Sequence, residues 1–291
     1  MICSQCPRRC GALRTRERGE GCCRMPQDPV LARAALHFWE EPPISGKNGS
    51  GTVFFSGCSL GCVFCQNEEI SRRDFGRRVT LERLREICRE LVARGAHNIN
   101  FVNPTHYAHI IAALLEEPLG VPAVWNSGGY DRAETLKRLE GRIDVYLPDL
   151  KYLDAAPAGR YSAAPDYPEA ARAALREMVR QTGPCVFDAD GLIKRGVMIR
   201  HLILPGQLEG AKRVMDWVLR EFGRETVRFS LMSQYTPWGQ AAEFPEINRK
   251  LRRGEMRAAQ AYLENLGLEG FCQERTSAAR EYTPPFDLTG I

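Results

Sequence analysis

From residue 51 onward, short apolar runs alternate with amphipathic segments about six times. The stretch after Thr80, for example, keeps its apolar residues on one helical face from Leu84 to Val92 and stops at Gly95, which predicts a helix with an N-cap and a terminal glycine. The predicted strands lie at 52–55, 98–102, 122–125, 143–147, 197–204 and 227–231, with an edge strand at 270–273; the other predicted helices lie at 110–115, 133–139, 171–179, 211–218 and 255–266. This alternation indicates an α/β fold whose parallel strands are joined by right-handed crossovers.

Three cysteines follow the first predicted strand. Cys58, Cys62 and Cys65 are separated by three and then by two residues. Three thiolates can hold three irons of a cuboidal iron–sulfur cluster, which leaves the fourth iron open for a reaction. Zinc knuckles usually pair cysteines in two C-x2-C hooks or add histidines, whereas this loop supplies three ligands. The spacing therefore favours a cluster with one open iron over a zinc site or buried thiols.

The same loop resembles the signature of a known family. The three cysteines, with Phe64 directly before the third, resemble the motif of radical S-adenosylmethionine (SAM) enzymes, and the string 55–67 resembles the pyruvate formate-lyase activating enzyme-like branch. The resemblance implies a partial (β/α)6 parallel barrel, a 4Fe–4S cluster on Cys58, Cys62 and Cys65, and SAM on the open iron with Phe64 near its adenine. It also implies reductive cleavage of SAM to a 5'-deoxyadenosyl radical that abstracts hydrogen.

Polar residues stand where the predicted strands end. In parallel barrels the loops after the carboxyl ends of the strands build the active site, so we expect these residues to converge on one rim. They are Asn103 and Thr105 after the second strand, Asn126 and Ser127 after the third, Asp149 and Lys151 after the fourth, and Arg200 and His201 within the fifth. Each pair alone also fits ordinary turn chemistry or a buried hydrogen-bonded pair.

The resemblance gives these positions expected roles. Related enzymes commonly carry Gly-Gly-Glu after the second strand to receive the amino group of the bound methionine; here Asn103 and Thr105 stand in its place, and they accept such a bond more weakly than a carboxylate does. The pair after the third strand falls where activating enzymes place polar residues near the ribose and the methionine carboxylate. Asp149 and Lys151 match their acidic-x-Lys element, in which the lysine neutralises that carboxylate. The pair in the fifth strand is as compatible with a structural role as with contact to cofactor or substrate.

A second group of cysteines lies near the amino terminus. Cys3, Cys6, Cys10 and Cys23 read as a four-thiolate site for zinc or for a second iron–sulfur cluster, with no position left open. Gly-x-Cys ending at Cys23 matches the resembling branch, which favours Cys23 over its neighbour. Since the first ~25 residues contain little apolar material, they are expected to need metal in order to fold.

A lead-in helix is predicted between this module and the barrel. Leu31, Ala34, Ala35 and Phe38 share one helical face, and the Glu-Glu-Pro-Pro sequence at 40–43 ends it. The chain is therefore divided into an N-terminal Cys-rich module with its lead-in helix, residues 1–50, and a barrel, residues 51–291.

Composition narrows the possible environments. The 291 residues include eleven cysteines and carry a net charge of +4. No run is long enough to span a bilayer, and the first residues lack the apolar core of a signal peptide, so a cytoplasmic location is expected and a disulfide scaffold is not. The charge is too small to indicate nucleic acid as a partner.

Three functions remain open from the sequence. The leading one is a radical SAM enzyme that activates a glycyl-radical enzyme, supplied with electrons by a donor such as flavodoxin or ferredoxin. The second is radical SAM modification of a small molecule or peptide. The third, a non-catalytic iron–sulfur carrier or metal-binding module, is disfavoured because a carrier needs four protein ligands on its cluster.

Overall fold

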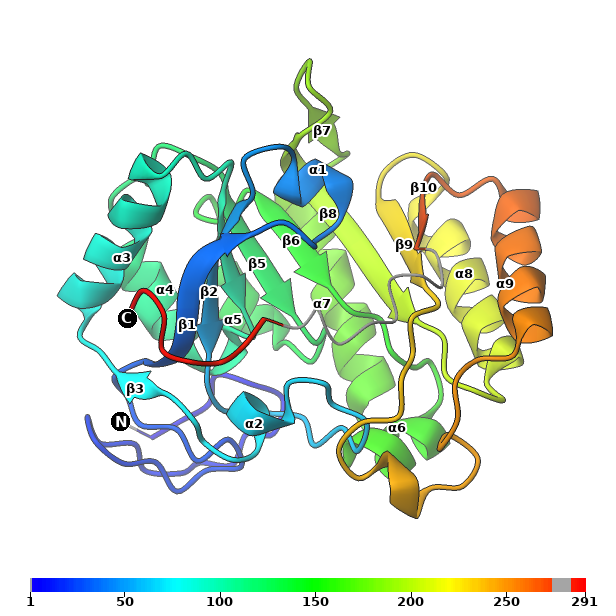
Figure 1. The fold of residues 1–291 in the computed structure, drawn as a ribbon, viewed down its shortest axis with the longest axis horizontal. Coiled ribbons are helices and arrows are strands. Elements are labelled where there is room, and N and C mark those ends of the chain that lie inside the picture. Colours follow the sequence, from blue (N-terminus) through cyan, green and yellow to red (C-terminus); the bar gives the residue numbers. More distant parts are fainter. Residues whose placement is uncertain (1, 274–283) are drawn as a thin grey trace.

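The structure is a computed structural model that describes residues 2–273 and 284–291. A ten-stranded sheet forms the centre of this part of the chain, in the order β10-β9-β8-β6-β5-β4-β2-β1-β3, with β7 paired to β8 off this path (Figure 1). The parallel strands are β2 (Ser50–Phe55), β4 (Ile99–Val102), β5 (Ala123–Ser127), β6 (Val145–Pro148), β8 (Ile193–Leu202), β9 (Arg228–Met232) and β10 (Gly270–Gln273). The expected α/β fold with a mostly parallel sheet is confirmed.

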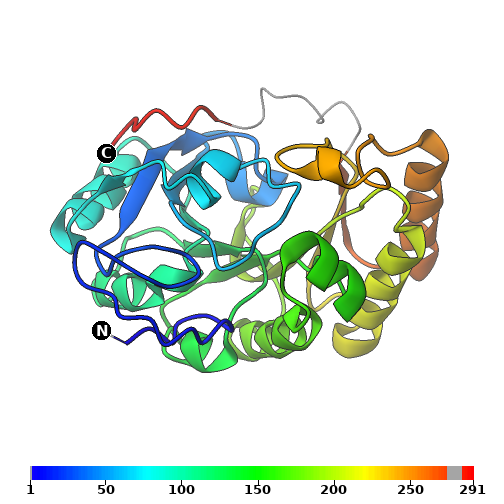
Figure 2. The same ribbon diagram turned by 90° about the horizontal axis from the view of Figure 1, so that it is seen from below.

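Helices connect the parallel strands and cover the outer face of the curved sheet, as Figure 2 shows. They are α3 (Leu81–Ala93), the 3-10 turn η1 (Thr105–Tyr107) with α4 (Ala108–Leu114), α5 (Ala133–Lys137), α6 (Ala155–Ser162), α7 (Tyr167–Thr182), α8 (Leu208–Phe222) and α9 (Arg253–Leu266). The shorter helices are α1 (Pro42–Ser45), α2 (Glu68–Ser71) and η2 (Ala241–Glu243). Because every parallel strand runs in the same direction, their carboxyl ends meet at the end of the molecule where α2 and α6 lie (Figure 1).

Helix α3 shows why the local predictions succeed. The Thr80 hydroxyl accepts a hydrogen bond from the amide of Arg83 at 3.2 Å, which makes it the N-cap. Leu84, Ile87 and Leu91 are buried against the sheet. Gly95 follows the helix at a φ of 89°, a left-handed backbone that glycine adopts without steric penalty.

The predicted lead-in helix is wrong: residues 30–37 form a strand, β1 (Val30–His37), which pairs antiparallel with β2. Leu31, Ala32 and Ala34 are all buried, because β1 is covered on both faces. In a segment this short, a strand buried on both faces and a helix with one apolar stripe produce the same apolar spacing. Strand β1 therefore joins the sheet of the barrel instead of linking a separate module to it.

The edges of the sheet carry further elements that the sequence did not predict. Strand β3 (Arg77–Arg78) pairs with the start of β1, and β7 (Val186–Phe187) forms a hairpin with β8. Residues 284–291 lie along β1, where the amide of Ala34 donates to the carbonyl of Thr289 at 2.8 Å. Within the described residues, no helix is both long enough and apolar enough to cross a membrane.

Candidate active site

A cavity of about 1230 Å³ opens beside the carboxyl ends of the parallel strands, and it is also lined by residues 37–42 and 45–46, which connect β1 to β2. The loop after β2 lines it with all three cysteines of the x3-x2 spacing and with Phe64. Six of the polar residues predicted for the site also line it: Asn103, Asn126, Ser127, Asp149, Lys151 and Arg200. The structure thus brings most of the predicted site residues to one cavity.

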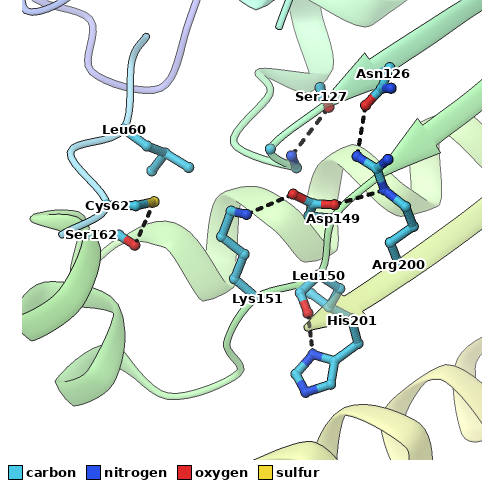
Figure 3. Close-up of polar contacts among 12 residues, drawn as sticks. Leu60, Cys62, Asn126, Ser127, Asp149, Leu150, Lys151, Ser162, Arg200 and His201 are labelled. Carbon is cyan, nitrogen blue, oxygen red and sulfur yellow. Dashed lines mark hydrogen bonds and ion pairs between the residues drawn. The ribbon is translucent and has the colours of Figure 1, made fainter. Parts of the chain in front are cut away.

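Each sulfur of the cysteine loop has a polar neighbour. The Cys58 sulfur accepts a hydrogen bond from the amide of Leu60 at 3.4 Å. The Cys62 sulfur lies 3.0 Å from the Ser162 hydroxyl at the end of α6 (Figure 3), and the Cys65 sulfur lies 3.4 Å from the Ser71 hydroxyl. Two helices that the sequence did not predict, α2 and α6, therefore help to orient the loop.

Asp149 pairs with two cations, Lys151 and Arg200, on the wall of the cavity that faces the cysteine loop. One carboxylate oxygen lies 2.6 Å from Lys151 Nζ, and the other accepts a bond from Arg200 Nε at 2.9 Å (Figure 3). Arg200 Nη2 in turn donates to Asn126 Oδ1 at 2.7 Å. Burial alone would raise the pKa of Asp149, but Lys151 and Arg200 hold it below its usual value. The carboxylate is thus charged at neutral pH and keeps both cations in place.

Comparison with known proteins decides the family. The domain of the radical SAM superfamily matches residues 52–217, which is more than half of the chain. The chain belongs to the radical SAM superfamily. It is 30% identical over 277 residues to the uncharacterized protein MJ0674 of Methanocaldococcus jannaschii, with 92% of this chain and 75% of that protein covered.

Solved structures share the fold of this chain. SuiB of Streptococcus suis, solved alone and bound to its precursor peptide SuiA, matches with a TM-score of 0.53 in both structures, at 15% and 14% sequence identity. The matches cover 79% and 76% of this chain. The chain spans about half the length of SuiB, 50% and 48% in the two structures.

Membership in the superfamily implies a 4Fe–4S cluster and SAM, and the cavity residues fit both groups. Burial, together with the nearby thiols of Cys62 and Cys65, raises the pKa of Cys58 to about 12, so three thiolates in this loop need a cationic group between them. An iron–sulfur cluster supplies that charge. Lys151, whose pKa Asp149 and the thiols raise despite burial, places a charged ammonium group on the wall of the same cavity.

Phe64 and Gly128 shape the space next to the cysteine loop. The Phe64 ring is buried and packs edge-on against Tyr235, with ring centroids 5.8 Å apart. A Cβ on Gly128 would lie 3.1 Å from Leu60 Cδ1 and 3.7 Å from Lys151 Cε. Glycine at 128 therefore leaves room for the Leu60 side chain of the cysteine loop.

Two predicted site residues, Thr105 and His201, do not line the cavity. The Thr105 hydroxyl donates to Asp131 Oδ1 at 2.6 Å, and the Ser127 hydroxyl donates to the other oxygen of the same carboxylate. His201 Nδ1 lies 2.6 Å from the carbonyl of Leu150, and burial lowers the pKa of His201 to about 4 (Figure 3). Both residues hold the strand ends that carry Ser127 and Lys151.

Asn103 contributes through its backbone as well as its side chain. Its φ of 59° lies in the left-handed region, which asparagine tolerates better than most residues. The side-chain amide donates to the carbonyl of Gly57, and the backbone amide donates to the carbonyl of Asn126 at 2.7 Å. Asn103 thus ties the cysteine loop to the end of β5.

Sequence reasoning missed the acidic residues between β1 and α1. Glu40 Oε2 lies 3.2 Å from Arg200 Nη1, and Glu40 Oε1 accepts from Asn126 Nδ2 at 3.1 Å. Glu41 is 1% exposed. Burial raises the pKa of both glutamates, against the effect of Arg200. No local pattern indicates this role, because two acidic residues before two prolines look like the end of a helix.

The amino-terminal cysteines lie outside this cavity. Cys3, Cys6 and Cys23 are buried and Cys10 is exposed, whereas Cys22 is also exposed. Among the described residues, no three Cys, His, Asp or Glu side chains stand in the arrangement expected around a single metal ion.

Proposed function

We propose that this radical SAM enzyme holds its 4Fe–4S cluster with Cys58, Cys62 and Cys65 and uses SAM to abstract hydrogen from a substrate in the cavity. The observation that carries the proposal is the meeting of these three cysteines with the Asp149 and Lys151 pair across one cavity. When bound, the reduced cluster would supply one electron to the sulfonium group of SAM, and the bond from that sulfur to the 5' carbon would break to give methionine and a 5'-deoxyadenosyl radical.

The residues of the cavity rim bind and orient the cofactor in this proposal. Lys151 neutralises the methionine carboxylate, and Asp149 keeps the ammonium group in position. The side-chain nitrogen of Asn103 is occupied by Gly57, so its oxygen is the acceptor offered to the methionine amino group. Asn126 and Ser127 contact the ribose and the carboxylate, and Phe64 lies against the adenine.

Arg200, Thr105 and His201 act as positioning residues in this proposal. The Arg200 guanidinium donates to Asp149, Asn126 and Glu40, so it holds the side chains of these residues in position around the cavity. Thr105 and His201 hold strand ends through Asp131 and the carbonyl of Leu150. A rim held from several strands preserves the short distances that a radical abstraction requires.

The proposal allows two classes of substrate. The branch that the cysteine loop resembles suggests a glycine of a partner glycyl-radical enzyme, with flavodoxin or ferredoxin as the electron donor. The alternative is a small molecule or a peptide bound in the same cavity, which is lined by the cysteine loop and by Asp149 and Lys151. An electron paramagnetic resonance signal of a glycyl radical on an added partner would support the first, and turnover of a low-molecular-weight fraction would support the second.

The test of the chemistry is formation of 5'-deoxyadenosine. Anaerobically reconstituted protein with dithionite and SAM should release it, and replacement of Cys58, Cys62 and Cys65 together by Ala should abolish the release. The product is measured by liquid chromatography, with Cys88→Ala as the matched control because Cys88 is buried in helix α3. Product formation by the triple variant at the wild-type rate would remove these cysteines from the proposal.

A further inference from the structure

Ser162, the last residue of α6, directs its hydroxyl at the cysteine loop. Its Oγ lies 3.0 Å from the Cys62 sulfur (Figure 3), whereas the polar contacts to the Cys58 and Cys65 sulfurs measure 3.4 Å. Ser162 is fully buried. Because a hydrogen bond is electrostatically stronger inside a protein than in water, this contact can stabilise negative charge on the Cys62 sulfur.

The hydroxyl of Tyr152 extends this contact into a chain of hydrogen bonds. It lies 3.0 Å from Ser162 Oγ, and the Tyr152 side chain is also buried. A cysteine that binds a metal does so as a thiolate, which can accept a hydrogen bond and has no proton to donate. The single proton of the Ser162 hydroxyl therefore serves the bond to Cys62, and the Ser162 oxygen accepts the bond from Tyr152. Hydrogen bonds connected in this way polarise and strengthen one another.

Backbone hydrogen bonds hold the end of α6 against the cysteine loop. The amide of Gly61 donates to the carbonyl of Ser162 at 3.2 Å, and the amide of Val63 donates to the carbonyl of Tyr161 at 2.9 Å. Gly61 and Val63 are the two neighbours of Cys62 in the chain. The loop and the helix are thus joined on both sides of Cys62, which keeps its sulfur beside the Ser162 hydroxyl.

Tyr152 directly follows Lys151, and contacts with Tyr167 hold this short segment in place. The backbone amide of Lys151 donates to the Tyr167 hydroxyl at 2.9 Å, and that hydroxyl lies 2.8 Å from the carbonyl oxygen of Asp149. The rings of Tyr152 and Tyr167 pack edge-on, with centroids 5.6 Å apart. The segment that carries the cavity lysine therefore also sets the position of the hydroxyl that contacts Ser162.

We propose that Ser162 is a positioning residue of the cluster site: its hydroxyl, held by Tyr152, donates a hydrogen bond to the thiolate of Cys62 and raises the reduction potential of the cluster. Hydrogen bonds to the sulfurs are among the features that set the potentials of iron–sulfur clusters. The reduced cluster carries one more negative charge than the oxidised cluster, so a donor to its sulfur stabilises the reduced form more. The inference rests on the proposed function, since it requires a cluster on Cys58, Cys62 and Cys65.

A redox titration followed by electron paramagnetic resonance tests this role without any use of activity. In protein reconstituted anaerobically with iron and sulfide, Ser162→Ala should lower the equilibrium constant for one-electron reduction of the cluster about tenfold, which is a fall of about 59 mV in the midpoint potential. Ser50→Ala is the matched control. Ser50 is also a fully buried serine, but its hydroxyl donates to Asn98 Oδ1 at 2.6 Å at the end of β2 away from the cysteine loop, so this variant should keep the wild-type potential.

Tyr152→Phe tests the same chain of hydrogen bonds while keeping the aromatic ring. It should lower the midpoint potential in the same direction but by less than Ser162→Ala, because the Ser162 hydroxyl can still donate to Cys62. Tyr161→Phe is its matched control on α6, since the Tyr161 hydroxyl donates to Glu246 Oε1 at 2.9 Å. The Tyr161 carbonyl that holds the loop is unaffected by this exchange, so the wild-type potential is expected.

Iron content separates failure of this inference from failure of the proposed function. The wild-type protein should hold about four irons more per chain than the Cys58, Cys62 and Cys65 to Ala variant. Equal iron in these two proteins would overturn the proposed function and the inference together. Equal midpoint potentials of Ser162→Ala and Ser50→Ala would overturn the inference alone. If Ser162→Ala does not hold the cluster, equal potentials of Tyr152→Phe and Tyr161→Phe would have the same consequence.

Discussion

Asp149 pairs with both Lys151 and Arg200. The remaining contacts of these two cations determine which of them has hydrogen-bond donors available for a ligand. Each of the three nitrogens of Arg200 donates to an oxygen of the protein, from Asp149, Glu40 and Asn126. Lys151 makes its 2.6 Å contact with a single carboxylate oxygen, and an ammonium group has three donors. Of the two, Lys151 is therefore the cation available to a ligand carboxylate.

Lys151→Ala should weaken SAM binding by about 1.5–3 kcal/mol, the value of a hydrogen bond to a charged group. The dissociation constant is measured by equilibrium binding to anaerobically reconstituted protein. Lys194→Ala serves as the matched control, because Lys194 pairs with Asp188 at 3.1 Å and is 43% exposed. Equal affinities of the two variants would assign Lys151 a structural role.

The sequence predicted those site residues that can be recognised from their local spacing or from a position directly after a strand. The x3-x2 cysteines and Asp149 belong to this class, since parallel strands bring their carboxyl ends together without further information. Glu40 could not be predicted, because its partner Arg200 is 160 residues away and the turn that brings them together depends on β1. Asp131 was missed for a similar reason: its role appears only when Thr105 and Ser127 are seen to share it.

At the scale of elements, long amphipathic helices were predicted well and short elements poorly. Helix α7, with sixteen residues, has enough turns to show its period, whereas β1 has eight residues that are covered on both faces. The identity of β1 is set by its pairing with β2 and with residues 284–291, which no local pattern records. Helix α6, which carries Ser162, was missed because it has eight residues and contains Pro157 and Gly159, two residue types that disfavour a helix.

The turn between β5 and α5 gives a prediction at this scale. Gly129 has a φ of 73°, and a Cβ there would overlap the carbonyl of Asp149. Gly129→Ala should therefore lower the free energy of unfolding by roughly 1–2 kcal/mol, the cost of a non-glycine residue in the left-handed region. It should lower it by a further amount because the Asp149 backbone is displaced. Gly95→Ala isolates the first effect, because Gly95 has a φ of 89° and open space around it. Thermal unfolding should show the larger loss for Gly129→Ala, and equal losses would contradict the close approach.

At the scale of the whole molecule, the sheet is an incomplete barrel with β10 near one edge and β1 near the other. An open edge exposes unpaired backbone groups that can pair with another chain. Residues 284–291 cover part of β1: Leu288 donates to the carbonyl of Ala32 at 3.1 Å, and Asp287 pairs with Arg33 at 2.7 Å. The Phe286 ring packs against Phe54 of β2 with centroids 5.5 Å apart, so this segment also supports the strand that leads into the cysteine loop.

Substitutions at Leu288 test whether residues 284–291 protect the edge of β1. Leu288→Pro removes the amide donor to Ala32 and cannot adopt the φ of 63° found there. The variant should unfold at a lower temperature, by roughly 2–4 °C for each kcal/mol lost, and should scatter more light on storage because the edge of β1 is exposed. Leu288→Gly keeps the amide and accommodates the positive φ, so it should scatter no more light than the wild-type protein. If the proline and glycine variants behave alike in both measurements, the hydrogen bond to Ala32 does not protect the edge, and side-chain packing by Leu288 accounts for whatever stability is lost.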